Sequence, residues 1–209
     1  MAGSCSAWTQ ARQFYDRNDY EMRSAQKEAR TAWEPVPAGD YLQAMGQHVA
    51  SVCVITTAIG EERYGLTATA VCSVSAQPPR LLVCVNRSSF AHAKIAEADA
   101  FCVNVLSETQ DIVAKAFAGM LGPGADRFGV AKWTILRTGA PALVGAAAAF
   151  DCVVGETLGQ STHTVFFGDV VGVSSRLGQD TLLYGSRKFR QMRKILLSQE
   201  AGAGETLHF

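Results

Sequence analysis

The chain has 209 residues, of which 48% are hydrophobic, and its 19 basic and 19 acidic residues give a formal net charge of zero at pH 7. This length and apolar content suffice for one compact domain with a substantial core. A chain without net charge has no overall field that attracts nucleic acid or an anionic membrane, so neither is expected as a partner.

The sequence lacks the usual signs of export and of metal binding. No basic start followed by an apolar run is found at the N-terminus, and the richest apolar stretch, 140–150, is shorter than the roughly 20 residues that span a bilayer. The six cysteines contain no Cys-x-x-Cys pair and the four histidines lie far apart, so no metal site is expected. We therefore expect a cytoplasmic protein with free thiols, buried in apolar strands at Cys53, Cys72, Cys84, Cys102 and Cys152.

The first segment predicts a helix. Residues 7–32 are charged, rich in alanine and free of glycine and proline, and Glu34-Pro-Val-Pro-Ala-Gly then ends the pattern. The apolar positions form an interrupted stripe, which favours packing on a neighbouring surface such as a partner subunit. We expect a helical extension over 1–38, a core domain over 39–198 and a flexible tail over 199–209.

The core reads mainly as strands rich in β-branched residues, separated by glycine, proline and polar turns. The predicted strands are 49–58, 64–71, 80–86, 101–106, 147–154 and 164–173. The pattern favours a closed β-barrel over a dinucleotide-binding βαβ sheet, because the glycines of the 119–124 segment have the wrong spacing and follow a helix.

Three helices are predicted among or after these strands. The first, 88–98, begins on Ser88 and Ser89 as caps, and the second, 107–119, opens with the capping-box pattern Ser107-Glu108-Thr109-Gln110. The third, 186–198, is amphipathic and carries five basic residues. Its basic face is either a solvated surface or an interaction surface, and the sequence leaves both open.

The most informative segment runs from Gly65 to Ser89. It supplies many short hydroxyl side chains and little bulk, so a planar ligand can approach the backbone closely. Arg87 adds a fixed positive charge, and the helix that follows directs its first amides toward an anion. The segment is thus typical of an anion cradle beside a flat cofactor site, although ordinary strand residues with threonine for β propensity and serine facing water would look similar. The hydroxyl residues are Thr67, Thr69, Ser73, Ser75, Ser88 and Ser89.

The order of the motifs resembles the flavin reductase-like family. The family patterns G-L-T-A-S/T-S, S-V-S-x-x-P-P and N-R/K-x-S have counterparts at 65–70, 73–79 and 86–89. Further counterparts follow at 101–106, 117–119, 139–143 and 163–168, so the resemblance covers about Tyr41 to Phe189. It implies a mainly β fold, the FMN-binding split β-barrel of Greek-key type with short flanking helices, usually as a homodimer with flavin near the subunit interface.

The resemblance also implies roles for particular residues. The ring and ribityl chain of FMN or FAD would contact Thr67, Ala68, Thr69, Ala70, Ser73, Val74 and Ser75, and the phosphate side would contact Asn86, Arg87, Ser88 and Ser89. Phe117 would close the pocket, and Tyr184, Arg187 and Phe189 would reach it from the C-terminal segment.

His163 is the catalytic candidate, because it takes the place of the histidine in the family's G-D-H motif, which is associated with NAD(P)H binding and turnover. Ser161 and Thr162 stand where the family has Gly and Asp, so this imidazole lacks a neighbouring carboxylate.

The activity implied by the resemblance is an NAD(P)H:flavin oxidoreductase that passes hydride from NADH or NADPH to FMN or FAD and supplies reduced flavin to a partner monooxygenase. Three alternatives remain open at the level of sequence. They are a reductase of cobalt corrinoids, a non-catalytic flavin- or haem-binding barrel, and an interaction module that uses the basic final helix.

Overall fold

The computed structural model describes residues 34–192, so the predicted helix 7–32, Cys5 and the tail 199–209 lie outside the described residues. The chain divides into two compact units, with the boundary between Met45 and Gly46. The first unit contains α3 (Ala38–Met45), a helix that the sequence analysis did not predict. No helix within 34–192 is long and apolar enough to cross a membrane.

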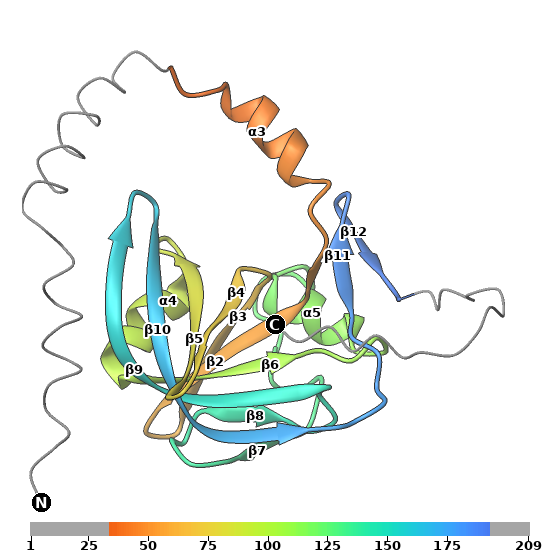
Figure 1. Cartoon of the computed structure of the whole chain (residues 1–209). Coiled ribbons are helices and arrows are strands. Elements are labelled where there is room, and N and C mark those ends of the chain that lie inside the picture. Colours follow the sequence, from red (N-terminus) through yellow and green to blue (C-terminus); the bar gives the residue numbers. More distant parts are fainter. Residues whose placement is uncertain (1–33, 193–209) are drawn as a thin grey trace, which may run out of the picture. The chain divides into compact units, whose positions relative to one another are not determined.

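The second unit is built around one antiparallel sheet in the order β3-β2-β6-β9-β10-β5-β4 (Figure 1). The expectation of a mainly β fold is therefore confirmed. The six predicted strands are all present, and β4, which was not predicted as a strand, is added. The strands are β2 (Cys53–Ile59), β3 (Glu62–Ala68), β4 (Val71–Ala76), β5 (Pro79–Asn86), β6 (Ala100–Val105), β9 (Ala148–Gln160) and β10 (His163–Ser175).

The two edge strands of this sheet are neighbours in sequence. β3 ends at Ala68 and β4 begins at Val71, so only Thr69 and Ala70 separate the opposite edges. The sheet must therefore curl until its edges meet at this corner, where the Cys84 N–H donates to the Ala70 carbonyl at 3.0 Å. Among the described strands no ladder joins β3 to β4, which gives the split form of barrel that the resemblance implied.

The main core fills the inside of the curled sheet. Alternate residues of β5 face inward, and Val83 and Val85 are fully buried in one cluster with Phe101 of β6 and Phe166 of β10. Helix α4 (Phe90–Ala98) adds Ile95 to the same cluster. Burial of each such side chain contributes about 1.5–3 kcal/mol, which fixes the strands that carry the site.

A second cluster lies under α5 (Asp111–Phe117) and the small hairpin of β7 (Trp133–Ile135) and β8 (Pro141–Leu143). The Phe117 ring packs edge-on against Phe128 and Trp133, with ring centroids 4.9 and 5.5 Å away. A Cβ at Gly65 would lie 2.7 Å from Phe117 Cε1, so the ring rests directly on β3. This packing requires glycine at position 65.

A three-stranded sheet joins β1 (Ala50–Ser51), β11 (Leu183–Gly185) and β12 (Lys188–Arg190). The predicted helix 186–198 is therefore wrong over 186–192, and its remaining residues lie outside the described range. Ser186 and Arg187 connect β11 to β12 with φ of 50° and 60°, the backbone of a type I′ hairpin turn. Pairing of β11 with β1 stabilises the hairpin relative to the helix that the spacing of apolar residues in 186–198 predicts.

Both predicted internal helices exist but begin differently. Ser89 takes the N-cap position of α4, yet its side chain makes no capping hydrogen bond. α5 begins only at Asp111, because the first residues of the predicted capping box form a turn in which the Ser107 N–H donates to Gln110 Oε1 at 2.9 Å.

The thiols differ in burial. Cys53, Cys102 and Cys152 are buried as expected, whereas Cys72 is exposed and Cys84 half-buried. Burial raises the pKa of the Cys53 thiol to about 12, so this side chain stays protonated and unreactive at neutral pH.

Candidate active site

A pocket of about 370 Å³ opens where the edges of the main sheet meet, and we call it the hydroxyl pocket. It joins segments that are far apart in sequence, and most of its residues are small or apolar. The lining residues are Val52, Leu66, Thr67, Ala68, Thr69, Ala70, Cys84, Asn86, Ala118, Met120, His163, Tyr184 and Phe189.

The β3–β4 corner supplies one wall of the hydroxyl pocket. The Thr67 hydroxyl donates to the Ala114 carbonyl at 2.7 Å, which ties β3 to α5. Thr69 and Ala70 are exposed. Because alanine and threonine add little bulk, this wall leaves room for a flat ligand close to the backbone.

Asn86 and His163 enter the pocket from paired strands, since they are direct partners in the β5–β10 ladder. Asn86 Oδ1 accepts hydrogen bonds from the N–H and the hydroxyl of Ser88, both at 2.9 Å. Nδ1 of His163 lies 2.9 Å from the Thr162 hydroxyl. Thr162, which replaces the expected aspartate, is thus a neutral hydrogen-bond partner that fixes the imidazole.

The β11–β12 hairpin brings an aromatic pair to the pocket. Tyr184 and Phe189 are partners across the hairpin, with ring centroids 5.6 Å apart. Arg187 lies in the hairpin turn, where it is exposed and does not line the pocket.

Arg87 has its contacts on strand β10 and the end of β9. Its Nε donates to the Thr164 hydroxyl at 3.3 Å, and its guanidinium lies across Gly159, where a Cβ would collide with it. Nε2 of His92 contacts the same Thr164 hydroxyl at 2.8 Å. Burial and then the Arg87 charge lower the pKa of His92, which keeps this imidazole neutral.

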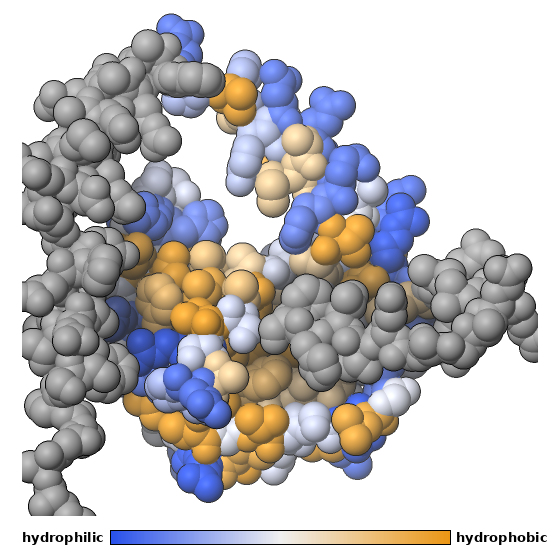
Figure 2. Space-filling model, viewed as in Figure 1, coloured by the Kyte–Doolittle hydropathy of each residue, from blue (hydrophilic) through white to orange (hydrophobic). Residues whose placement is uncertain are grey.

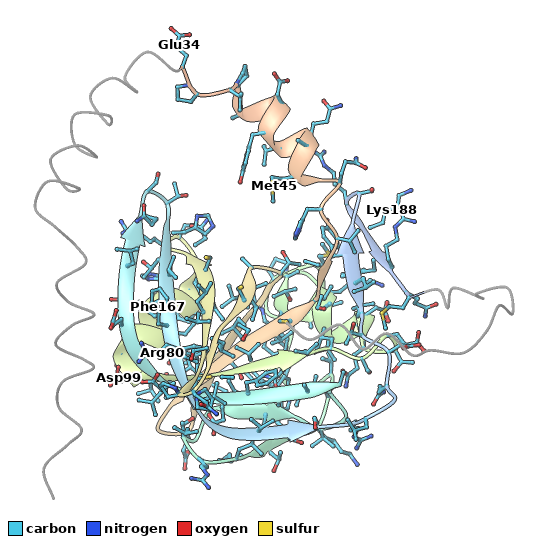
Figure 3. All side chains as sticks on the ribbon, in the orientation of Figure 1. Glu34, Met45, Arg80, Asp99, Phe167 and Lys188 are labelled. Atoms are coloured by element: carbon cyan, nitrogen blue, oxygen red, sulfur yellow. The ribbon has the colours of Figure 1, made fainter. Side chains whose placement is uncertain are left out.

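The structure does not bring Ser73, Val74 or Ser75 to the hydroxyl pocket. They lie on β4 toward the hairpin with β5, and Ser75 pairs with Arg80. Arg80 in turn donates from Nε to Asp169 at 2.6 Å, several residues along β5 from Asn86 (Figure 3 labels Arg80 and, on the neighbouring strand, Phe167). Ser88 and Arg87 also do not line the pocket.

A second cavity, of about 570 Å³, adjoins the first and is called the arginine pocket here. Ser89 and Phe117 line this cavity and not the hydroxyl pocket. Sequence analysis missed Arg63 and Arg127, because neither belongs to a motif and only the fold brings them together. Phe90, Asp126 and Phe128 also line this cavity.

Metal ligands do not gather in the part of the chain that the structure describes. Over 34–192, no three side chains of His, Cys, Asp or Glu are placed to hold one ion.

Comparison with known proteins gives consistent matches. The model of the family described as "Flavin reductase like domain" matches residues 45–193. The chain is 39% identical to an FMN reductase (NADH) RutF of Bradyrhizobium diazoefficiens over 77% of this chain and 88% of that protein.

Solved structures agree with these matches. The Streptomyces globisporus NADH:FAD oxidoreductase SgcE6 superposes with a TM-score of 0.70 at 30% identity, over 78% of this chain and 99% of that one. BorF, the flavin reductase component of a bacterial two-component tryptophan halogenase, gives a TM-score of 0.69 at 29% identity, over 76% and 100% of the two chains.

Proposed function

The chain belongs to the flavin reductase-like domain family, and on that premise we propose that it transfers hydride from NADH to a flavin, FMN or FAD. The observation that carries the proposal is the hydroxyl pocket, which combines the small Thr67–Ala70 wall with Asn86, His163 and an aromatic pair. The reaction consumes NADH, one proton and oxidised flavin and yields NAD⁺ and dihydroflavin. The flavin supplies the hydride-accepting ring, and this chain supplies binding and orientation.

The residues present fit a flavin. Ala68 and Ala70 leave the backbone accessible to a flat ring, and the exposed Thr69 offers a hydroxyl at its edge. The turn from Asn86 to Ser89 would face the phosphate side, with Arg87 contributing charge from its position against Thr164. Tyr184 and Phe189 provide apolar surface on the C-terminal side of the pocket.

His163 is assigned to positioning the nicotinamide. Hydride transfer requires the two rings to stack at about 3–3.5 Å, so a fixed hydrogen-bonding group beside the ring contributes through orientation. The Thr162 hydroxyl holds Nδ1, which leaves Nε2 as the hydrogen-bonding atom for a carboxamide. The imidazole is exposed at the start of β10, where a second nucleotide has access.

Reduced flavin is assigned to a separate acceptor, such as a partner monooxygenase. The pocket is lined by exposed residues, including Thr69, Asn86 and Met120, so a reduced flavin can leave. BorF, a relative by structure, is the reductase component of a two-component system, which supports this assignment.

A homodimer is part of the proposal. Apolar side chains are exposed along β4, β9 and β10, with Val74, Leu158 and Val173 between 46% and 58% exposed. Figure 2 shows that hydrophobic residues also reach the surface on the face in view. A second copy that packs on these strands would remove these side chains from water.

Stopped-flow mixing of the protein with each pairing of NADH or NADPH with FMN or FAD tests the activity. We expect loss of the visible flavin absorbance under anaerobic conditions, faster with NADH than with NADPH. A protein that binds flavin but leaves NADH unoxidised in excess flavin would be a non-catalytic flavin-binding barrel, and the proposal would fail.

A further inference from the structure

Residues 155–163, which we call the hairpin end, lead into His163 but have little support from the rest of the main sheet. Among the described strands, β6 pairs with β9 only as far as Val153, so 155–160 pairs with β10 alone. Figure 1 shows the hairpin end projecting away from β6. On its other side β10 is paired with β5, and the Arg87 N–H donates to the Thr162 carbonyl at 2.9 Å. The position of His163 therefore depends on contacts made from the β5 side.

The Arg87 side chain crosses the hairpin end on the face opposite to His163. Its Nε donates to the Thr164 hydroxyl of β10 at 3.3 Å, and its guanidinium lies across Gly159 of β9. One side chain thus connects β5, β10 and β9. Thr164 is buried and follows the exposed His163 directly, because successive side chains of a strand point to opposite faces. Arg87 therefore supports the strand from behind His163.

The Thr164 hydroxyl also connects the hairpin end to α4. Thr164 is 9% exposed, and its oxygen lies 2.8 Å from Nε2 of His92 in the first turn of that helix. A guanidinium can only donate, so the hydroxyl oxygen accepts from Arg87 and its own proton is left for Nε2 of the neutral His92. The His92 ring packs edge-on against Phe166, with centroids 5.4 Å apart, which fixes the imidazole. We call Arg87, Thr164 and His92 together the arginine brace.

We propose that Arg87, held in the arginine brace, is a positioning residue for hydride transfer, because it fixes the hairpin end so that His163 can orient the nicotinamide. The inference rests on the proposed function, which assigns that task to His163. This role is additional to the charge that Arg87 contributes on the phosphate side. Flavins with and without a phosphate separate the two roles.

Gly159→Ala tests the arginine brace without altering Arg87 itself. The new Cβ would take the place of the guanidinium, which is the flexible end of a side chain, and Gly159 does not line the hydroxyl pocket. Gly155→Ala is the matched control on the same strand, since its Cβ would lie 3.1 Å from Asp169 Oδ2 and not against Arg87. Thr164→Val removes the hydroxyl at the centre of the brace, and Thr164→Ser keeps it.

We expect Gly159→Ala and Thr164→Val to lower kcat/KM for NADH about fivefold or more, equally with FMN and with riboflavin, which has no phosphate. Thr164→Ser and Gly155→Ala should keep most of the turnover. In a His163→Ala background, Gly159→Ala should cost little more, because both changes remove the same interaction. A loss seen with FMN alone, or a full additional loss in the double variant, would overturn the proposal.

Hydrogen exchange separates this inference from the proposed function, because it requires no turnover. The backbone amides of 157–163 and that of Arg87 should exchange faster in Gly159→Ala than in the wild-type protein, with Gly155→Ala unchanged. Exchange at the wild-type rates overturns the inference even in an active flavin reductase. Faster exchange in a protein that does not oxidise NADH would retain the arginine brace and remove the proposed function.

Discussion

The Thr162 hydroxyl lies 2.9 Å from Nδ1 of His163, at the entrance to the hydroxyl pocket. A neutral hydroxyl orients the imidazole without the charge that an aspartate would add. The proposed role of His163 is therefore one of placement, and it is separable from flavin binding.

His163→Ala is expected to lower NADH-dependent flavin reduction by roughly tenfold or more, because the nicotinamide loses a positioning group. Flavin affinity should change little, since the Thr67–Ala70 wall is intact. Steady-state turnover and flavin fluorescence quenching measure the two effects. Unchanged turnover would remove His163 from the mechanism.

Thr162→Val tests the orienting hydrogen bond, with nearly the same side-chain shape. Loss of a hydrogen bond worth about 1 kcal/mol predicts about a fivefold fall in turnover, smaller than that of His163→Ala. Thr162→Ser, which keeps the hydroxyl, is the matched control and should retain most activity. A serine variant as impaired as the valine variant would contradict the assignment.

Gly65→Ala should destabilise the fold by about 1–3 kcal/mol, because the new Cβ would lie 2.7 Å from Phe117 Cε1 and 3.0 Å from the Ile55 carbonyl. Urea unfolding measures the loss. Gly39→Ala is the matched control, since nothing lies within 4 Å of that Cβ and the site is helical. Equal midpoints for Gly65→Ala and wild type would show that the ring moves aside freely.

The lowered pKa of His92 predicts that the free energy of unfolding decreases in acid. Its pKa in the folded protein is lowered by burial and by Arg87, so below the unfolded pKa of about 6.5 the unfolded chain binds the extra proton first. Stability is therefore full above this pH and declines as the pH falls toward the folded pKa. His92→Gln, which can still contact Thr164, should show a smaller drop in melting temperature between pH 7.5 and pH 5.5, measured by circular dichroism. An identical drop in both proteins would exclude His92 as a source.

Strands with a strong apolar pattern could be predicted from sequence. A hairpin whose turn lacks the usual residues could not. The unbroken apolar run 81–85 predicts β5, whereas 71–76 is exposed along most of its length and carries little apolar pattern. Residues 186–190 have helical spacing, yet they form a hairpin through Ser186 and Arg187, which lack the glycine or asparagine usual in such turns.

The site residues also fall into a group that the sequence predicts and a group that it does not. Thr67–Ala70, Asn86 and His163 were predicted because they belong to contiguous motifs, and the structure brings them to one pocket. Arg63 and Arg127 were missed because their proximity depends on the packing of Phe117 and Phe128 between β3 and the loop after α5. Pairwise placement of this kind leaves no local pattern in a single sequence.

At the Thr69–Ala70 corner the edge strands β3 and β4 approach each other without pairing, and the hydroxyl pocket lies at this gap in the curled sheet. A bound flavin would contact both sides of this gap. The pocket is lined on one side by Leu66 and Thr67 of β3 and on the other by Cys84 and Asn86 of β5, the neighbour of β4. Occupancy and closure of the sheet are then thermodynamically linked, and bound flavin raises the free energy of unfolding. In the protein without flavin, hydrogen exchange of the backbone amides of the main sheet should be fastest at Ala70 and Val71, next to this gap.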